Sequence, residues 1–366
     1  MNVLILANSS FGLYKFRKEL IEALVEKEYR VFASLPEGEF FDELGGIGCR
    51  VIPNRYLDRR GTNPANDMKL YRYYYALLKK VSPDVVLTYT IKPNIYGGMV
   101  CGRLNIPCIA NITGLGTAVE NGGMLQKLAL GMYKAGLKKA HKVFFQNTHD
   151  KEFFEDHSIR TGAFDILPGS GVNTRDYDYE PYPTETAPVV FLIVGRIMKD
   201  KGTDEVLAAA KEIKRDHPSV IFRFIGSFDE DYREKIDNAV AEGTIEYVGS
   251  QKDMRPWYKG CSAILHASYH EGMSNVLLEA ASTGRPVIAT DVPGCIETYE
   301  PGVTGLSFKP KDTQSLIDAI EHFLQLSNAK RAAMGRAGRA KVEREFDRQI
   351  VVDRYMQEIN NLQELI

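Results

Sequence analysis

Two carboxylates in one stretch of the chain have types and positions that suit the binding of a sugar. Glu271 lies in a glycine-bearing turn after an apolar strand, and Glu279 lies about one turn inside the helix that follows. A carboxylate is a poor neighbour for a phosphate, but it accepts hydrogen bonds from paired hydroxyl groups. Sugar and ribose hydroxyls are therefore the expected partners of Glu271 and Glu279.

The same stretch predicts an anion site between the two carboxylates. The run that starts at Val276 consists of strong helix formers and stops before Gly284 and Pro286. A strand, a glycine turn and a helix in this order aim free backbone N–H groups and the positive end of the helix at an anion. The backbone groups expected to contact phosphate and sugar belong to Gly272, Met273, Ser274 and Asn275.

A second stretch supplies the positive charge that a phosphate requires. The apolar strand at 189–194 leads into Gly195, followed by Arg196 and, five residues later, Lys201. Arginine offers a planar fork to phosphate oxygens and lysine offers a point charge. Together they suit a diphosphate held close to the Gly195 turn.

These two motifs together resemble the signature of a known enzyme family. Gly195-Arg196-x4-Lys201-Gly202 is followed seventy residues after Lys201 by Glu271-x7-Glu279. This pattern is similar to that of the large retaining glycosyltransferase family often called family 4, which has the GT-B fold. Within the family, the chain resembles bacterial transferases that build capsule, O-antigen or protein-linked glycans on a polyprenyl diphosphate, among them the N-acetylgalactosaminyltransferases of protein glycosylation loci. The resemblance covers nearly the whole chain.

The resemblance implies a role for each of these residues. Arg196 and Lys201 would neutralise the leaving nucleoside diphosphate, Glu279 would take the ribose hydroxyls, and Glu271 would hold sugar hydroxyls and orient the donor. These three catalytic candidates (Arg196, Lys201 and Glu271) require no metal and no further cofactor. The alternatives are surface charges at a strand end for the two cations and an exposed helix position for Glu279.

Residues early in the chain are candidates for the acceptor side. The family brings the backbone near Gly12, in the loop after the first strand, close to the donor phosphate and the acceptor. An ordinary turn between strand and helix is the alternative explanation of this glycine. Lys15 and Arg17 follow at once. They are either contacts for an acceptor diphosphate or surface charges at the start of a helix.

Two further loops are expected at the same edge of the first sheet. Lys92 follows the fourth strand, near the position where many relatives have a histidine that contacts the donor sugar. This departure from the pattern weakens any step that would depend on that histidine. Thr113 and Gly114 come from the loop after the fifth strand.

The elements that position these residues alternate between strand and helix, which predicts parallel α/β layers. Strands are expected in the first half at 3–7, 30–35, 48–53, 84–89, 107–111, 143–146 and 164–167. In the second half they are expected at 189–194, 220–225, 245–248, 263–266 and 286–289. Pro301-Gly302 and Thr304-Gly305 are expected to form turns.

The length of 366 residues favours two domains joined by a Pro- and Tyr-rich linker at 173–188. We expect an acceptor-binding Rossmann-like domain at 1–180 and a nucleotide-sugar-binding one at 188–345. The resemblance further implies that the two domains face each other across a cleft, and that a final helix at about 346–366 returns to the first domain.

Composition restricts the compartment and the partners. A hydrophobic content of 44% and a charged content of 26% are those of a globular protein, and a net charge of −2 predicts no affinity for nucleic acid. The five cysteines form no Cys-x-x-Cys pair, which favours free thiols in a reducing cytosol. We do not expect the apolar run at 3–7 to act as a signal peptide, because it is too short and lacks a basic flank. No apolar run approaches the ~18 residues that a membrane span requires. A cytoplasmic protein, at most peripheral on the inner face of the cell membrane, is expected.

One segment suggests contact with that membrane. Residues 124–143 contain five lysines and no acidic residue, interleaved with apolar positions at helical spacing. Such a helix suits anionic lipid headgroups. A buried helix with a solvated basic edge explains the pattern equally well.

The expected function is transfer of a sugar, with retention, from a nucleotide donor to a polyprenyl-diphosphate saccharide. A UDP-linked hexose or N-acetylhexosamine is the expected donor. One rival is a GT-B nucleotide-sugar 2-epimerase, which the paired carboxylates and the Arg196–Lys201 pair disfavour. The other is a non-catalytic nucleotide-sugar-binding protein.

Overall fold

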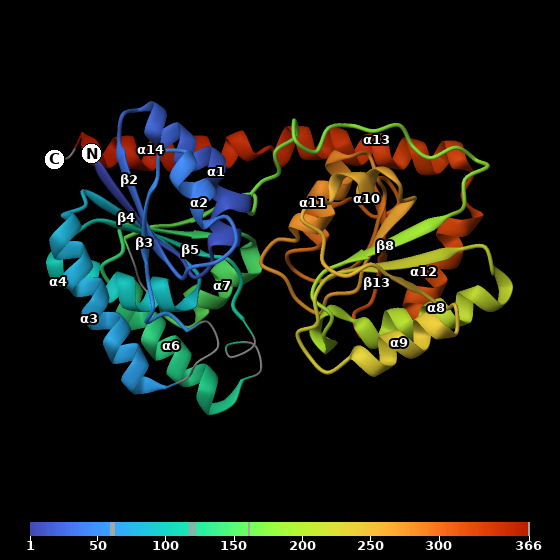
Figure 1. Ribbon diagram of the computed structural model, residues 1–366, viewed down its shortest axis with the longest axis horizontal. Helices are drawn as coiled ribbons and strands as arrows, with labels where there is room; N and C mark the ends of the chain where they lie inside the picture. Colours follow the sequence, from blue (N-terminus) through green and yellow to red (C-terminus); the bar gives the residue numbers. More distant parts are fainter. Residues whose placement is uncertain (59–62, 117–118, 120–121, 160–161, 365–366) are drawn as a thin grey trace. The chain divides into compact units, whose positions relative to one another are not determined.

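The computed structural model describes residues 1–58, 63–116, 119, 122–159 and 162–364 (Figure 1). The chain divides into two compact units. Unit 1 comprises Met1–Ser170 and Arg348–Ile366, and unit 2 comprises Gly171–Asp347. The last two residues of the expected final helix, 365 and 366, lie outside the described residues.

Unit 1 is built on a parallel sheet that has seven strands within the described residues, in the order β3-β2-β1-β4-β5-β6-β7. The strands are β1 Asn2–Leu6, β2 Arg30–Leu35, β3 Arg50–Pro53, β4 Val85–Tyr89, β5 Cys108–Ile112, β6 Lys142–Phe145 and β7 Phe164–Ile166. Each falls within two residues of its expected position. Continuous apolar runs form these strands because helices cover the sheet on both faces.

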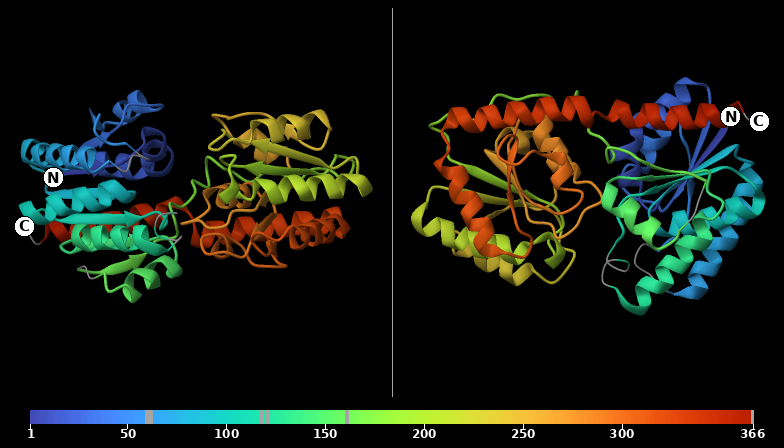
Figure 2. Two further views of the ribbon diagram at one scale, coloured as in Figure 1. Left: turned by 90° about the horizontal axis from the view of Figure 1, so that it is seen from below. Right: turned by 180° about the vertical axis from the view of Figure 1, so that it is seen from behind.

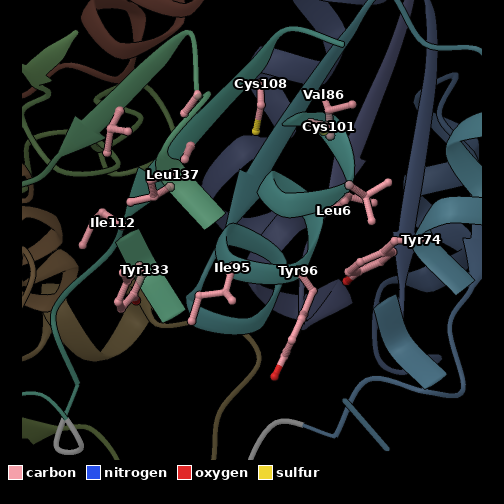
Figure 3. Packing of buried hydrophobic residues seen from close by; sticks show 14 of the residues in the cluster. Leu6, Tyr74, Val86, Ile95, Tyr96, Cys101, Cys108, Ile112, Tyr133 and Leu137 are labelled. Atoms are coloured by element: carbon pink, nitrogen blue, oxygen red, sulfur yellow. The ribbon is translucent and has the colours of Figure 1, made fainter. Parts of the chain in front are cut away.

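The helices of unit 1 cover the two faces of this sheet (Figures 1 and 2). They are α1 Ser10–Glu26, α2 Phe41–Gly46, α3 Pro64–Val81, η1 Pro93–Gly97, α4 Gly98–Leu104, α6 Gly123–Leu137, α7 Thr148–Asp156 and α14 Arg348–Gln363. Leu4 and Leu6 of β1 point into the core formed with α3, η1, α4, α6 and α7, part of which Figure 3 shows. Val3 and Ile5 point to the opposite face, where α1, α2 and α14 pack.

Unit 2 contains a second parallel sheet, with six strands within the described residues in the order β10-β9-β8-β11-β12-β13. They are β8 Val190–Val194, β9 Ile221–Ile225, β10 Glu246–Tyr247, β11 Ala263–His266, β12 Val287–Thr290 and β13 Gly305–Phe308. Thr304 lies in the expected turn, but Gly305 is the first residue of the last strand, which was not expected. A Cβ at Gly305 would lie 2.5 Å from the Val287 carbonyl oxygen, so this glycine permits close packing of two strands.

Helices cover this second sheet on both faces as well (Figure 1). One core unites the sheet with α8 Thr203–Asp216, α9 Arg233–Ala241 and α12 Thr313–Gln325. The other face packs against α10 Arg255–Lys259 and α11 Asn275–Ser282, and α13 Asn328–Glu345 lies against α11. Two short 3₁₀ turns, η2 Lys199–Lys201 and η3 Ile296–Thr298, follow β8 and β12.

The chain enters and leaves unit 2 at neighbouring points. The Val172 N–H donates to the Phe346 carbonyl oxygen at 2.9 Å, and Thr174 Oγ1 donates to Asp347 Oδ2 at 2.5 Å. The following residues pack onto unit 2, where the Tyr177 carbonyl oxygen accepts from Arg339 Nη1 at 2.8 Å. Residues 171–180, which the sequence places in the first domain, therefore belong to unit 2.

Candidate active site

In each unit the chain has a topological switch point, at which the order of strands reverses. From β8 the chain moves outward to β9 and β10, and then returns to β11 on the other side of β8 and continues to β12 and β13. Unit 1 reverses in the same way between β1 and β4. Ligands of open α/β sheets bind beyond the carboxyl ends of the strands at such points. The candidate residues of unit 2 follow β8 and β11, the two strands that flank its switch point.

Glu271 is the centre of a polar cluster in unit 2. Its Oε1 atom accepts from the Lys201 ammonium group and lies 3.1 Å from His266 Nε2. Lys201 Nζ also donates to Ser268 Oγ at 3.2 Å, and His266 Nε2 lies 3.2 Å from Ser274 Oγ. The cluster joins β11, the loop after it and η2, so two motifs seventy residues apart form one site.

The cluster holds Glu271 in its ionised form. Burial by itself would raise the pKa of the Glu271 carboxyl, but the charge of Lys201 and the hydrogen bond from His266 together lower it well below its ordinary value. The Glu271 side chain is 18% exposed and that of Lys201 is 22% exposed. At neutral pH this carboxylate accepts hydrogen bonds and does not donate a proton.

The loop that carries Glu271 is fixed by the neighbouring loop after β12. Gly294, with φ of 80°, packs so closely that a Cβ there would overlap the Glu271 carbonyl oxygen and lie 2.8 Å from that of Gly272. The Ser274 N–H donates to the Gly294 carbonyl oxygen at 2.8 Å. Thr290 Oγ1 donates to the Ser268 carbonyl oxygen at 2.7 Å. Backbone contacts on both sides therefore set the position of the Glu271 carboxylate.

Helix α11 begins at Asn275, directly after this loop. Ser274 is its N-cap, and Ser274 Oγ accepts from the Leu277 N–H at 3.5 Å. The other N–H groups of the first turn have no partner within the helix, as at any helix start. In the described part of the chain, the buried Asn275 Oδ1 has no hydrogen-bond partner. The N–H groups that lack a partner within the helix and the positive end of the helix can together bind an anion at this point.

Arg196 has a partner that its sequence context does not show. Its Nη1 atom lies 2.5 Å from Oδ2 of Asp229, a residue that follows β9. Gly195 and Gly226 permit this approach of two loops, because a Cβ at Gly226 would overlap the Gly195 carbonyl oxygen. The Arg196 side chain is 40% exposed, so part of its guanidinium remains accessible to a ligand.

Glu279 lies in α11 and accepts from Tyr258 Oη at 2.8 Å through its Oε2 atom. Burial and the nearby Glu279 carboxylate raise the pKa of Tyr258 well above its ordinary value, so this phenol stays protonated and donates. Glu279 is half-buried. This hydrogen bond fixes the orientation of the Glu279 carboxylate. A group that accepts hydrogen bonds from ribose hydroxyls would need such a fixed orientation.

The candidates after β1 all lie in a helix, which corrects the loop expected at Gly12. Ser9 is the N-cap of α1, and the Gly12 N–H donates to Ser9 Oγ at 3.2 Å. The helix begins at Ser10 because of this cap, so Gly12, Lys15 and Arg17 are helical. Arg17 is 4% exposed, and its guanidinium lies 4.8 Å from the centre of the Tyr89 ring. It is therefore neither a surface charge nor an exposed phosphate contact. Lys15 Nζ lies 5.1 Å from the centre of the Phe40 ring.

The candidates after β4 and β5 lie at the switch-point edge of unit 1. Lys92 Nζ forms an ion pair with Asp67 Oδ1 at 2.7 Å, and Tyr96 Oη donates to the other oxygen of Asp67 at 2.9 Å. Thr113 and Gly114 directly follow β5 and are half-buried, Gly114 with φ of 127°.

Several site residues were not anticipated from the sequence. His266, Asp229 and Tyr258 bond to the predicted residues, and Gly294 supports the loop. Thr90, directly after β4, has φ of 72°, and its buried Oγ1 has no hydrogen-bond partner in the described part of the chain. Positive φ is strained for a β-branched residue and gathers at functional sites. Only His266, the polar end of an apolar strand, carried a visible sequence signal.

Both units match known protein families. Residues 2–147 match the family described as glycosyl transferase 4-like, and residues 177–341 match the family described as glycosyl transferases group 1. This chain belongs to the glycosyltransferases. The glycosyltransferase is 24% identical over 378 residues to the N,N'-diacetylbacillosaminyl-diphospho-undecaprenol alpha-1,3-N-acetylgalactosaminyltransferase of Campylobacter jejuni, covering 97% of each chain. It is also 29% identical over 163 residues to the capsular polysaccharide biosynthesis glycosyltransferase CapM of Staphylococcus aureus, covering 43% of this chain and 42% of CapM.

Solved structures confirm the expected GT-B fold of this glycosyltransferase. Sucrose-phosphate synthase from Thermosynechococcus elongatus superposes with a TM-score of 0.84 at 20% identity, over 100% of both chains. HepE of Anabaena in complex with UDP gives a TM-score of 0.78 at 17% identity, over 99% of this chain and 100% of that one. Within the described residues, no helix has the length and apolar character that crossing a membrane demands.

Proposed function

We propose that this glycosyltransferase moves a sugar, with retention, from a UDP-linked donor to a polyprenyl-diphosphate-linked saccharide. The donor sugar is a hexose or an N-acetylhexosamine, and the product serves synthesis of a surface polysaccharide or glycan. The observation that carries the proposal is the similarity to the Campylobacter jejuni enzyme, which extends over 97% of both chains and therefore through both units. The name of that relative describes an acceptor of this class.

The proposed donor site is the carboxyl edge of the sheet in unit 2. Arg196 and Lys201 carry the charge that a departing nucleoside diphosphate needs, and fixed cations of this kind are a large catalytic effect. Without ligand, these charges are balanced by Asp229 and Glu271. A diphosphate would therefore compete with two carboxylates for two cations. The similarity in fold to a UDP complex supports uridine as the nucleoside.

Glu271 has a positioning role in this proposal. Because its pKa is depressed, it is ionised at neutral pH and accepts hydrogen bonds from sugar hydroxyls. The acceptor hydroxyl attacks the face of the sugar from which the diphosphate departs, and a leaving phosphate oxygen takes the proton. Glu279 accepts hydrogen bonds from the ribose hydroxyls, with Tyr258 holding its carboxylate in place.

The test is a nucleotide-release assay with UDP-, GDP- and ADP-linked sugars, each with and without a polyprenyl-diphosphate disaccharide. We expect release of UDP from one sugar donor only when the acceptor is present. NMR of the product then reports whether the anomeric configuration is retained.

Other outcomes contradict the proposal in distinguishable ways. Conversion of the nucleotide sugar without acceptor, with the nucleotide still attached, indicates an epimerase. Donor binding in a thermal-shift assay with no turnover on any acceptor indicates a binding protein. Acceptor-dependent release of GDP retains the transferase and overturns the donor assignment.

A further inference from the structure

Helix α6 of unit 1 exposes large apolar side chains in its first two turns. Met124 is 88% exposed, Leu128 is 61% exposed and Leu125 is 55% exposed. Exposure of three neighbouring large apolar residues costs free energy in water unless another surface covers them.

The other side of the same helix forms part of the core. Leu130, Tyr133 and Leu137 are buried, and Figure 3 shows Tyr133 and Leu137 among the packed side chains. At 3.6 residues per turn, Met124 and Leu128 lie opposite this buried stripe. The sequence predicts a single apolar stripe along this helix. In the structure, some of these apolar residues are buried in the core and others are exposed on the opposite side.

The exposed apolar residues are flanked by positive charge. Lys127, Lys134 and Lys138 are exposed and share one side of the helix, at spacings of seven and four residues. The other two lysines of the segment bond elsewhere. Lys139 Nζ donates to the Gly102 carbonyl oxygen at 2.9 Å, and Lys142 Nζ pairs with Glu358 at 2.9 Å.

A helix with several acidic residues packs against the buried side of α6. Helix α7, which contains Glu152, Glu155 and Asp156, packs against α6 through Phe154 and Tyr133, whose ring centres are 5.1 Å apart. Tyr133 belongs to the core stripe, so the exposed apolar and lysine residues face away from this contact. Every charged side chain from Gly123 to Lys138 is a lysine, so the charge on this exposed side of the helix has a single sign.

We propose that Met124, Leu125 and Leu128, together with Lys127, Lys134 and Lys138, form a surface that docks onto an anionic lipid membrane. We call these six residues the α6 face. Apolar side chains that enter the headgroup layer, beside lysines that pair with anionic headgroups, are the two components of interfacial membrane binding. The single sign of charge selects anionic lipid over a second copy of the chain, because two such faces repel each other.

The position of the α6 face in unit 1 links it to the proposed acceptor. The chain runs from the carboxyl end of β5 into the start of α6. The exposed apolar residues lie in that first part of the helix, close to the carboxyl edge where a ligand of the sheet would bind. The inference extends the proposed acceptor class, because a docked α6 face brings this edge to the surface that holds a polyprenyl-linked saccharide.

The test is flotation of the full-length protein with vesicles that contain no acceptor. We expect binding to phosphatidylcholine vesicles that contain phosphatidylglycerol, weaker binding at high salt, and no binding to pure phosphatidylcholine. Each lysine near the surface contributes roughly fivefold to the partition coefficient, so K127Q/K134Q/K138Q is expected to bind roughly a hundredfold more weakly. M124S/L128S is expected to lose about tenfold at both salt concentrations.

The matched control is K27Q/K79Q/K80Q. These lysines are also exposed and belong to unit 1, but they precede β2 and β4 at the opposite edge of the sheet. The control removes the same charge and is expected to bind vesicles like the wild type. Equal binding by the two triple variants, or equal binding of the wild type to neutral and anionic vesicles, would overturn the inference.

Activity separates this inference from the proposed function. With a short-chain, water-dispersible acceptor and no vesicles, the α6 variants are expected to keep the wild-type kcat, because none of the six residues is a site candidate. Loss of kcat in that assay would mean that the α6 face serves the active site instead of a membrane. Turnover without vesicle binding refutes the docking surface alone, and vesicle binding without turnover refutes the proposed function alone.

Discussion

Glu271 and Lys201, two of the candidate site residues, form an ion pair with each other. The ion pair leaves little unbalanced charge at the edge of the sheet when no ligand is bound. A diphosphate that attracts Lys201 would free one oxygen of Glu271 for the sugar hydroxyls. Diphosphate and sugar are therefore expected to bind together more tightly than their separate affinities suggest.

Substitution of either member is expected to lower turnover. In the proposed mechanism, Lys201→Ala removes a fixed cation that would stabilise the leaving diphosphate, and Glu271→Gln removes the anionic group that would accept hydrogen bonds from sugar hydroxyls. Each should reduce kcat by about 100-fold or more, the scale for one electrostatic stabiliser. Lys211→Ala is the control, since Lys211 lies more than two turns into α8 and its exposed side chain pairs with Glu242. Near-wild-type turnover of Lys201→Ala would refute the diphosphate assignment.

The depressed pKa of Glu271 also predicts a pH dependence of stability. Because the folded-state pKa lies below the ordinary value of 4.5, ionised Glu271 stabilises the fold above that pH, and the effect is lost as the pH falls toward the folded-state pKa. Glu271→Gln should lower the free energy of unfolding by about 2 kcal/mol at pH 7. The difference from wild type in urea unfolding should stay constant down to about pH 5 and shrink below pH 4.5. A constant difference down to pH 3 would contradict a shifted pKa.

Residue types and spacing predicted Arg196, Lys201 and Glu271 as candidates, but they did not predict the partners that the fold brings to the candidate residues. Asp229 is 33 residues from Arg196 and meets it only because β9 pairs with β8. Tyr258 reaches Glu279 because α10 and α11 cover the same face of the sheet. Such contacts depend on strand order and layer assignment, which no local pattern encodes.

The loop after β12 shows how one element can set the geometry of another. It contributes no charged candidate to the predicted site, yet Gly294 packs on the backbone of Glu271 and accepts from the N–H of Ser274. The close approach depends on a glycine at this position, because any Cβ would overlap a carbonyl oxygen. The loop acts as a fixed support for the residues between β11 and α11.

Gly294→Ala is expected to displace this support and lower activity. The matched control is Gly302→Ala, because Gly302 has φ of 78°, compared with 80° at Gly294, but has no atom within 4 Å of its would-be Cβ. Both substitutions carry a backbone cost of about 1 kcal/mol. Only Gly294→Ala should also reduce kcat, by roughly tenfold or more, as expected when a positioned group is shifted. If thermal unfolding and steady-state kinetics show equal losses of stability and of kcat in both variants, the loop has no positioning role.

Element positions followed from the sequence where apolar runs were long and failed where a single side chain decided the boundary. The first seven strands were predicted within two residues. The start of α1 was not, because the Ser9 cap moves it to Ser10 and makes Gly12 helical. For Arg17, the sequence allowed an acceptor contact or a surface charge at a helix start, but α1 turns this side chain toward Tyr89 in the interior.

At the scale of the molecule, unit 1 is assembled from both ends of the chain. Helix α14 contributes Val351, Val352, Tyr355 and Ile359 to the core that also contains β1 and α1. Tyr355 is fully buried, accepts from Asn111 Nδ2 at 2.8 Å and lies 5.1 Å from the Phe144 ring centre. Unit 1 therefore cannot complete its core until the last residues have been added, whereas unit 2 is continuous in sequence.

Tyr355→Ala is accordingly expected to weaken unit 1 and to spare unit 2. Loss of a fully buried aromatic side chain should cost about 3–5 kcal/mol, and it also leaves the buried Asn111 amide without its partner. Leu277→Ala is the matched variant for unit 2, since Leu277 is equally buried in the core behind α11. Differential scanning calorimetry should show two transitions, one lowered by Tyr355→Ala and the other by Leu277→Ala. If both variants shift one common transition, the units unfold together, and α14 then stabilises the whole chain instead of the unit whose core it completes.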